Sequence, residues 1–314
     1  MINKILFLVP PRLGDSLMIV PALALLKELQ PNCSIDVIST STLGISVYQN
    51  NPYCDSVYLA SEALLNDKFT QQYDLLIAAH RDSKILELTD QLKKPTLLIE
   101  SADLEQAQPQ QALNFIQGIF SDSTPMTEPK NYQLFPTDKD IKDASHLLKN
   151  GKKYIGLHLG CHSVNKRGNL FPWQKNQTHK KIWLLKNFIE LAKQFKQLYQ
   201  DYDIVLTGGD NEEHLASEFI KHIPGTISLV GKTDLLQLAA LMQHFSVYVC
   251  PDTGTMHVAC AMNIPLIALF GPTNVKRTGP YPKANFRRVI ETKDLRKLRP
   301  ETVLLVIQEL LNSQ

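Results

Sequence analysis

Short apolar runs alternate with longer segments of helical spacing along nearly the whole chain, and this alternation limits the fold more than any other feature. The first run, Ile5–Val9, precedes a segment reaching Leu29 whose apolar residues are spaced for burial on one helix face. Further strands are expected at Ser34–Ile38, Tyr73–Ala79 and Thr96–Ile99. Apolar strands that alternate with amphipathic helices are typical of a parallel α/β sheet.

A second series with the same pattern begins near Tyr154. The stretch between Ser121 and Asp138 separates the two series, because it is rich in Pro, Thr and charged residues and precedes a helix expected at Lys139–Leu148. The expected strands of the second series are Tyr154–Leu159, Asp203–Leu206, Ile227–Leu229, Val247–Cys250 and Leu266–Phe270. Its expected helices include Leu184–Phe195, Glu212–His222 and Leu235–Gln243.

Two domains are predicted, because 314 residues exceed the usual size of one domain. Residues 1–150 are expected to form an N-terminal Rossmann-like domain and residues 151–290 a C-terminal one. Residues 291–314 form a tail whose apolar helix, Val303–Leu311, is expected to pack back on the first domain. A ligand is expected between the halves, beyond the carboxyl ends of the strands.

Charge and cysteine usage exclude several classes of protein. The chain has 33 basic and 31 acidic residues and a formal charge of +2, which gives no reason to expect nucleic-acid binding. Its 5 cysteines show no CxxC spacing, so neither a disulfide framework nor a zinc knuckle is indicated. The run Ile5–Val9 is too short for a signal peptide or a membrane span, and a cytoplasmic protein is expected.

Known nucleotide fingerprints and metal sites are also missing. The absence of GxGxxG argues against a nicotinamide dehydrogenase, and the absence of GxxxxGK[ST] argues against a P-loop kinase. His158 and His162 have no nearby residues that would complete a ligand set, so no metal site is predicted.

The segment from Val247 to Ala259 leads from an apolar strand through a small polar turn, centred on Gly254, into a helix. A helix start presents unpaired N–H groups and the positive end of the helix dipole, so this turn suits a diphosphate. An ordinary strand-to-helix turn is the alternative. Asp252, in the same turn, is either a helix cap or an acceptor for sugar hydroxyls.

Asp15 stands where the first strand gives way to a helix. A carboxylate there caps the helix by accepting backbone N–H bonds, or it acts as a general base toward an attacking hydroxyl. Pro21 removes a backbone donor from the same helix and is expected to kink it.

Two further strand ends carry candidate donor-binding residues. The strand Tyr154–Leu159 ends in a turn whose N–H and hydroxyl donors suit phosphate oxygens. Lys181, beyond it, is either a surface charge or the group that neutralises a leaving diphosphate. Glu212 and Glu213 open a later helix, where they favour the helix dipole or one of them accepts ribose hydroxyls. The turn after the strand Tyr154–Leu159 consists of Gly160, Cys161, His162 and Ser163.

Six segments, in this order, resemble the motifs of family 9 glycosyltransferases, the lipopolysaccharide heptosyltransferases. The resemblance is strongest over residues 4–40 and 153–281 and weak between about 50 and 150, where the family contacts its acceptor. The six are residues 12–15 (RLGD), 181–183 (KIW), 206–209 (LTGG), 229–233 (LVGKT), 251–257 (PDTGTMH) and 269–273 (LFGPT).

The resemblance implies a GT-B fold with the acceptor on the N-terminal domain and the donor on the C-terminal one. It implies inverting transfer of heptose from ADP-L-glycero-β-D-manno-heptose to the lipopolysaccharide inner core, without a metal or another cofactor. It assigns the base to Asp15, the diphosphate contact to Lys181, the ribose contact to Glu212 and the donor sugar to Asp252. The residues expected to line the diphosphate and sugar are Thr253, Gly254, Thr255, Met256 and His257.

The sequence departs from the family pattern at an insertion, Val164–His179, between the turn after the strand and the lysine. Lys166, Arg167 or Lys180 could therefore replace Lys181. The acceptor sugar is not specified by the sequence. A cluster of basic residues in the tail is a candidate contact with an anionic membrane that carries a lipid-linked acceptor. These residues are Lys293, Arg296, Lys297 and Arg299.

Three other functions remain compatible with the residues. A 2-epimerase of similar fold would turn over the nucleotide sugar without an acceptor. A transferase of the same fold could use a different donor sugar. A silent nucleotide-sugar-binding protein would bind the donor and transfer nothing, but Asp15 beside an intact donor turn argues against it.

Overall fold

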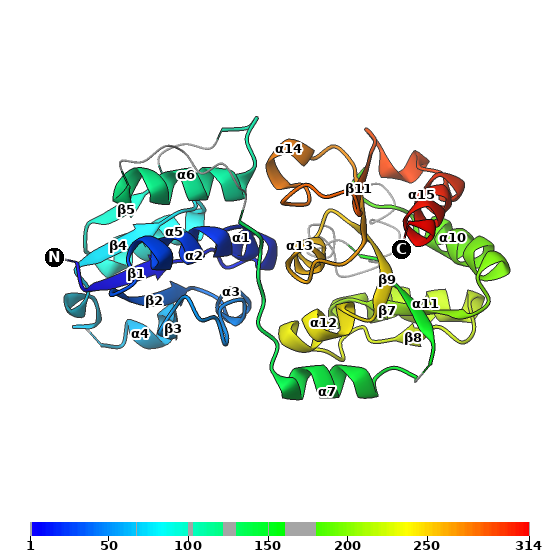
Figure 1. Ribbon diagram of the computed structural model, residues 1–314, viewed down its shortest axis with the longest axis horizontal. Coiled ribbons are helices and arrows are strands. Elements are labelled where there is room, and N and C mark those ends of the chain that lie inside the picture. The colour runs from blue at the N-terminus through cyan, green and yellow to red at the C-terminus, as the bar shows by residue number, and fades with distance from the viewer. Residues whose placement is uncertain are drawn as a thin grey trace. The chain divides into compact units, whose positions relative to one another are not determined.

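The computed structural model describes residues 2–66, 68–99, 103–121, 130–149, 151–160 and 180–313. Its residues group into two compact α/β units. The first unit contains Met1–Phe135 and Lys276–Pro282, and the second contains Pro136–Val275 and Lys283–Gln314. Each unit has one parallel sheet with helices on both faces (Figure 1).

The sheet of the first unit has the strand order β3-β2-β1-β4-β5. Its central strand pairs in parallel with β2 on one side and with β4 on the other. The strands are β1 (Lys4–Leu8), β2 (Ser34–Ser39), β3 (Ser56–Leu59), β4 (Leu75–Ala78) and β5 (Thr96–Leu98). The predictions for β1, β2, β4 and β5 are therefore confirmed, whereas β3 was missed.

Helices cover the first sheet because its central strand is apolar on both faces. Leu6 and Leu8 of β1 pack with Ile85 and Leu88 of α5 on one face. On the other face α2 packs against α6. The helices are α1 (Leu13–Met18), α2 (Val20–Leu29), α3 (Thr42–Ser46), α4 (Ala60–Ala63), α5 (Ser83–Leu92) and α6 (Gln108–Phe120).

The helix expected to run through Leu29 is broken at Ile19, which ends α1 and caps α2. Pro21 lies in the first turn of α2, where a missing N–H removes no helical hydrogen bond. The proline therefore separates two helices instead of kinking one.

The sheet of the second unit has the order β11-β10-β9-β6-β7-β8. The strands are β6 (Lys153–His158), β7 (Tyr202–Thr207), β8 (Ile227–Ser228), β9 (Phe245–Pro251), β10 (Leu266–Phe270) and β11 (Arg287–Glu291). The helices are α7 (Asp138–His146), α10 (Leu185–Leu198), α11 (Glu213–His222), α12 (Leu235–Met242), α13 (Gly254–Ala261) and α15 (Pro300–Asn312), whereas α14 (Val275–Thr278) lies almost entirely in the segment that joins the first unit. The five strands expected here are confirmed, and β11 is an additional edge strand.

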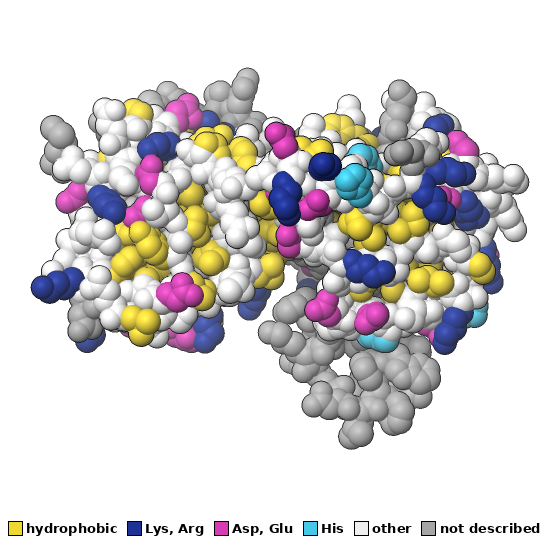
Figure 2. All heavy atoms as spheres, turned by 90° about the horizontal axis from the view of Figure 1, so that it is seen from below, with side chains coloured by type: hydrophobic (Ala, Val, Ile, Leu, Met, Phe, Trp, Pro, Cys, Tyr) yellow, Lys and Arg dark blue, Asp and Glu magenta, His cyan; other side chains and the backbone are white. Residues whose placement is uncertain are grey.

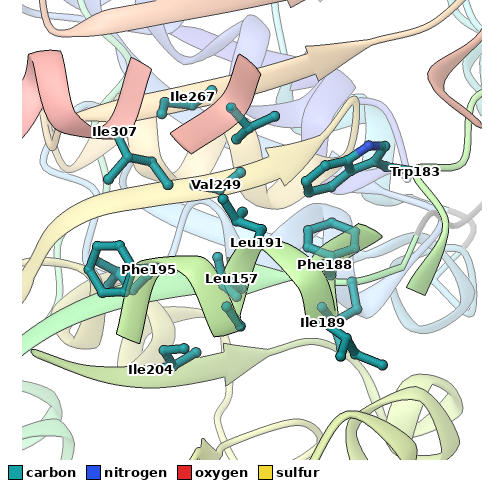
Figure 3. Close-up of a cluster of buried hydrophobic side chains, with 14 of the residues drawn as sticks. Leu157, Trp183, Phe188, Ile189, Leu191, Phe195, Ile204, Val249, Ile267 and Ile307 are labelled. Atoms are coloured by element: carbon teal, nitrogen blue, oxygen red, sulfur yellow. The ribbon is translucent and has the colours of Figure 1, made fainter. Parts of the chain in front are cut away.

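The tail helix α15 packs in the core of the second unit. Ile307 lies over the sheet near Val249 and Ile267, in the same cluster as Trp183 (Figure 3). The indole Nε1 of Trp183 donates to the carbonyl of Leu298, 2.9 Å away, just before α15. The expectation that this helix packs on the first domain is therefore wrong, because its apolar face has its partners in α10 and the second sheet.

The boundary between the units also differs from the predicted 150/151. Helix α7, with a capping box at Thr137 and Asp140, packs against α12 and belongs to the second unit. Conversely, Lys276–Pro282 joins the first unit although the residues on both sides of it belong to the second. Apolar spacing shows that a helix buries one face, but it does not show against which neighbour.

Charged side chains of both signs are interspersed on the face drawn in Figure 2, and hydrophobic side chains lie between them. Among the described residues, none of the helices is long and apolar enough to cross a bilayer.

Candidate active site

Each sheet has a point where the strand order reverses. Predicted site residues follow strands at these points. In the first unit the chain proceeds from β1 to β2 on one side and later adds β4 on the other. In the second unit the same reversal lies between β6 and β9. Loops that leave such neighbouring strands diverge and leave a crevice at the carboxyl ends, which is where open α/β sheets bind ligands.

Asp15 follows β1 at the first reversal, in the first turn of α1. The loop that leads to Asp15 is held in place by contacts with α3 and with Ser41, which directly precedes α3. Ser41 Oγ donates to the carbonyl of Pro11 at 2.6 Å, and Ser16 Oγ donates to the carbonyl of Gly44 at 3.1 Å. A Cβ on Gly44 would lie 2.6 Å from the carbonyl oxygen of Pro10, so only glycine permits this close approach.

The carboxyl group of Asp15 is partly buried and has an Arg12 guanidinium nitrogen 3.6 Å from Oδ2. Burial raises the pKa of Asp15, and the nearby Asp82 raises it further, while His80, Arg12 and Arg277 act in the opposite direction. Arg12, not Asp15, occupies the N-cap position of α1, and no side chain caps it. The structure therefore does not support the N-cap alternative for Asp15.

His80 follows β4, on the other side of the same reversal, and the sequence reasoning missed it. Its Nε2 lies 2.6 Å from the amide nitrogen of Gln108 on α6, and the residue is 7% exposed. Burial lowers the pKa of His80. The signal that could have identified it is the polar run His80, Arg81 and Asp82 directly after an apolar strand.

In the second unit Gly160 follows β6 and packs against Glu212. A Cβ on Gly160 would overlap Glu212 Oε1. The other carboxylate oxygen accepts the backbone N–H of Gly209 at 3.0 Å, and His158 Nε2 lies 3.5 Å from Oε1. Glu212 is buried, and its carboxylate accepts a backbone N–H at the start of a helix. Its contact with the ribose stays a prediction.

The turn after β9 has the predicted strand-turn-helix form. Thr253 is the N-cap of α13 and has no side-chain capping bond, so Asp252 is not the cap. The hydroxyls of Thr253 and Thr255 lie 2.8 Å apart. Asp252 and the next three residues are partly exposed, as a donor site requires.

Met256 and His257, by contrast, are buried in the second unit. Burial lowers the pKa of His257 to about 4, so the imidazole is neutral near pH 7. The burial of both side chains does not support their expected contact with a donor.

Lys181 lies beside the same turn. Its Nζ is 3.7 Å from Asp252 Oδ2, and the two side chains are 27% and 16% exposed. The carbonyl of Lys180 accepts the N–H of Leu295 at 2.9 Å, and Gly271 packs against that carbonyl. The backbone at Lys181 is thus fixed from two directions, and two residues predicted to bind the donor come together.

Other predicted residues lie outside the described part of the chain. These are Cys161, His162 and Ser163, which were predicted to contact the phosphates, and the alternative cations Lys166 and Arg167. Within the described ranges, no group of three or more His, Cys, Asp or Glu side chains could hold a metal ion. Metal independence stays a prediction.

Comparison with known proteins identifies the fold. The structure matches that of E. coli ADP-heptose lps heptosyltransferase II with a TM-score of 0.79 and 20% identity, over 99% of both chains. With two Rossmann-like parallel sheets in one chain, the protein has the GT-B fold.

Sequence comparison then identifies the family. The sequence model of glycosyltransferase family 9 (heptosyltransferase) matches residues 97–304, and the chain belongs to this family. Lipooligosaccharide heptosyltransferase 2 of Campylobacter jejuni is 24% identical over 91% of this chain and 87% of its own length. The Haemophilus influenzae protein of the same name is 34% identical, but over only 35% of this chain and 33% of its own length.

Proposed function

We propose that the protein is an inverting, metal-independent transferase that moves a heptose from ADP-heptose to an inner-core acceptor of lipopolysaccharide. Family membership supports heptosyl transfer. The name of the Campylobacter jejuni relative supports a lipooligosaccharide or lipopolysaccharide acceptor, and that of the E. coli structure supports an ADP-heptose donor.

Asp15 is the general base of the proposed reaction. It takes the proton of the attacking acceptor hydroxyl, whose oxygen bonds to the anomeric carbon of the heptose. The bond from that carbon to the diphosphate breaks, and its electron pair leaves with ADP. Attack from the face opposite the leaving group inverts the anomeric centre.

One observation carries this assignment: Asp15 is a partly exposed carboxyl group, with a raised pKa, at the strand reversal of the first unit. A base is most effective when its pKa approaches the working pH, and burial moves that of Asp15 in this direction.

The donor side is assigned to the strand reversal of the second unit. Lys181 and the N–H groups at the start of α13 would stabilise the charge that grows on the departing diphosphate. Asp252 would hold hydroxyls of the donor sugar, and Glu212 the ribose. The turn at Gly160–Ser163 would supply further donors to the phosphates.

A lipid-linked acceptor would bring the protein to the cytoplasmic face of the inner membrane. The basic tail is the candidate contact, although ion pairs neutralise part of it. Arg296 Nη2 lies 2.5 Å from Asp294 Oδ2, and Arg299 Nε lies 3.1 Å from Glu301 Oε2. Lys293 and Lys297 are the other two residues of this basic cluster.

The test is transfer from ADP-heptose to core fragments that end in Kdo, in one heptose or in two heptoses. Wild-type protein should glycosylate one of them, and Asp15→Asn should lower kcat by about 100-fold or more while ADP still binds. Near-normal turnover of the variant would reject Asp15 as the base.

Two accompanying measurements separate the alternatives. Donor turnover without acceptor, followed by NMR, would indicate an epimerase instead of a transferase. Thermal-shift screening against ADP-, GDP- and UDP-sugars identifies the donor, because specific binding stabilises the fold by mass action. Stabilisation by a GDP- or UDP-sugar alone would contradict the ADP-heptose assignment.

A further inference from the structure

A seven-residue segment, which we name the strap, carries Lys276–Pro282 onto the first unit. Lys276 forms an ion pair with Glu105, and the Tyr281 hydroxyl donates to Gln110 Oε1 at 3.0 Å. The Tyr281 ring lies 5.8 Å from that of Tyr132. These contacts fix the strap at both ends.

The strap brings Arg277 to the strand reversal of the first unit. The guanidinium lies close enough to Asp15 and His80 for its charge to lower the pKa of both. Asp15 follows β1 and His80 follows β4, on the two sides of the strand reversal where an open sheet binds its ligand, and Arg277 lies within electrostatic range of both. None of the sequence motifs indicates that Arg277 belongs there.

Two buried N–H groups in this cluster have no hydrogen-bond acceptor among the described residues. The first is Nδ1 of His80. The Gln108 amide nitrogen donates to Nε2 of the ring, so in the neutral imidazole Nδ1 carries the proton. The second is Nε of Arg277. Buried donors without an acceptor are rare in folded proteins because desolvation is not compensated, so these two donors are available to an oxygen atom from outside the chain, of a ligand or of water.

The charges around these donors restrict the kind of oxygen. Asp15 and Asp82 are opposed by Arg12 and Arg277, and the buried imidazole of His80 is neutral. The cluster is therefore electrically balanced. A carboxylate or phosphate would gain no net attraction from a balanced set of charges, whereas a sugar hydroxyl leaves the balance unchanged and has lone pairs that accept from N–H donors.

We propose that His80 and Arg277 bind one hydroxyl oxygen of the acceptor sugar, next to the hydroxyl that Asp15 deprotonates. This inference rests on the proposed function. The two residues then position the acceptor and take no proton in the reaction. Because they contact a hydroxyl other than the attacking one, they select among acceptors by the placement of that hydroxyl.

Paired variants of His80 test the first contact. The amide nitrogen of asparagine occupies about the position of Nδ1, and that of glutamine about the position of Nε2. His80→Asn should keep the acceptor KM within about twofold of wild type, whereas His80→Gln should raise it about tenfold, the scale of one lost hydrogen bond. The affinity for ADP, measured by calorimetry, should not change in either variant. The exposed His244→Gln is the matched control.

Arg277→Lys tests the second contact, because it keeps the positive charge and removes the Nε–H. We expect an acceptor KM raised about tenfold with the acidic limb of the pH–rate profile unmoved. The exposed Arg288→Lys is its control. A shifted acidic limb with an unchanged acceptor KM would instead make Arg277 a purely electrostatic neighbour of Asp15.

The outcomes distinguish this inference from the proposed function. If wild-type protein transfers heptose but both His80 variants keep the wild-type acceptor KM, the hydroxyl contact is wrong and the proposed function stands. If wild-type protein transfers nothing to any core fragment, the proposed function fails first. Equal rises in KM for His80→Asn and His80→Gln, with lowered melting temperatures, would show a structural role and overturn the inference.

Discussion

Lys181 and Asp252 form an ion pair in the second unit, with Nζ 3.7 Å from Oδ2. Lys181 precedes α10, and Asp252 follows β9. The pair is partly exposed beside the start of α13, so a bound diphosphate would compete with the carboxylate for the ammonium group. The geometry thus favours Lys181 over its exposed neighbour Lys180 as the diphosphate contact.

Replacing Lys181 with methionine should weaken ADP binding by about 10-fold to 100-fold, the scale of one charged hydrogen bond. Isothermal titration calorimetry with ADP measures this directly. Lys180→Met is the matched control and should change the affinity less than twofold. Greater loss in Lys180→Met, or in Lys166→Met, would transfer the diphosphate contact to that residue.

Asp15→Asn should raise the melting temperature at pH 7. The pKa of Asp15 is raised in the folded state, so the native protein binds more protons than the unfolded chain above the ordinary value of 3.8. Stability is therefore lost as pH rises from there through the folded pKa. The asparagine variant avoids this loss, and its advantage should vanish below pH 3.8.

Asp74→Asn is a control for which the opposite change in melting temperature is expected. Asp74 accepts the N–H groups of Asn3 and Lys4, which lower its pKa. Its contribution to stability is present at neutral pH and lost on acidification, so this variant should melt at a lower temperature at pH 7. Thermal melts of both variants across pH check the pair. A destabilised Asp15→Asn would show that the carboxylate makes a stabilising contact.

Gly44→Ala should lower the free energy of unfolding by about 1–3 kcal/mol, because the added methyl would overlap the backbone next to Asp15. The nearest backbone atom, the carbonyl oxygen of Pro10, lies 2.6 Å from the position that the methyl carbon would take. Gly118→Ala, on α6, has no atom within 4 Å of the added methyl and should be neutral or stabilising by up to about 1 kcal/mol. Urea unfolding compares them, and equal effects would contradict the close packing of Gly44.

Acidification should destabilise the second unit through His257. The pKa of this buried histidine falls from 6.5 to about 4 on folding, so stability is lost as pH decreases from 6.5 toward 4. The loss between pH 7 and pH 5 is about 2 kcal/mol. His257→Gln should remove that part of the pH dependence, measured by urea unfolding, whereas the exposed His244→Gln should keep it. An unchanged slope in His257→Gln would contradict the assignment.

All the strands that apolar runs predicted were found, and the two strands that were not predicted share a feature. Both β3 and β11 are edge strands, as are β5 and β8, which short apolar runs did predict. Residues of β3 are all half-buried, and β11 begins with Arg287 and Arg288 and ends with Glu291. A strand with one open edge needs fewer apolar residues, so its composition resembles that of a loop.

Alternating apolar runs determined the α/β class, residues at strand ends marked Asp15 and Asp252, and a short motif marked Lys181. These features are local, so the sequence alone reveals them. The tertiary structure decided which segments meet: it brought α15 into the second unit, the strap onto the first, and His80 and Arg277 to Asp15. Apolar periodicity shows that one face of an element is buried, but strand order and packing determine which other element covers that face.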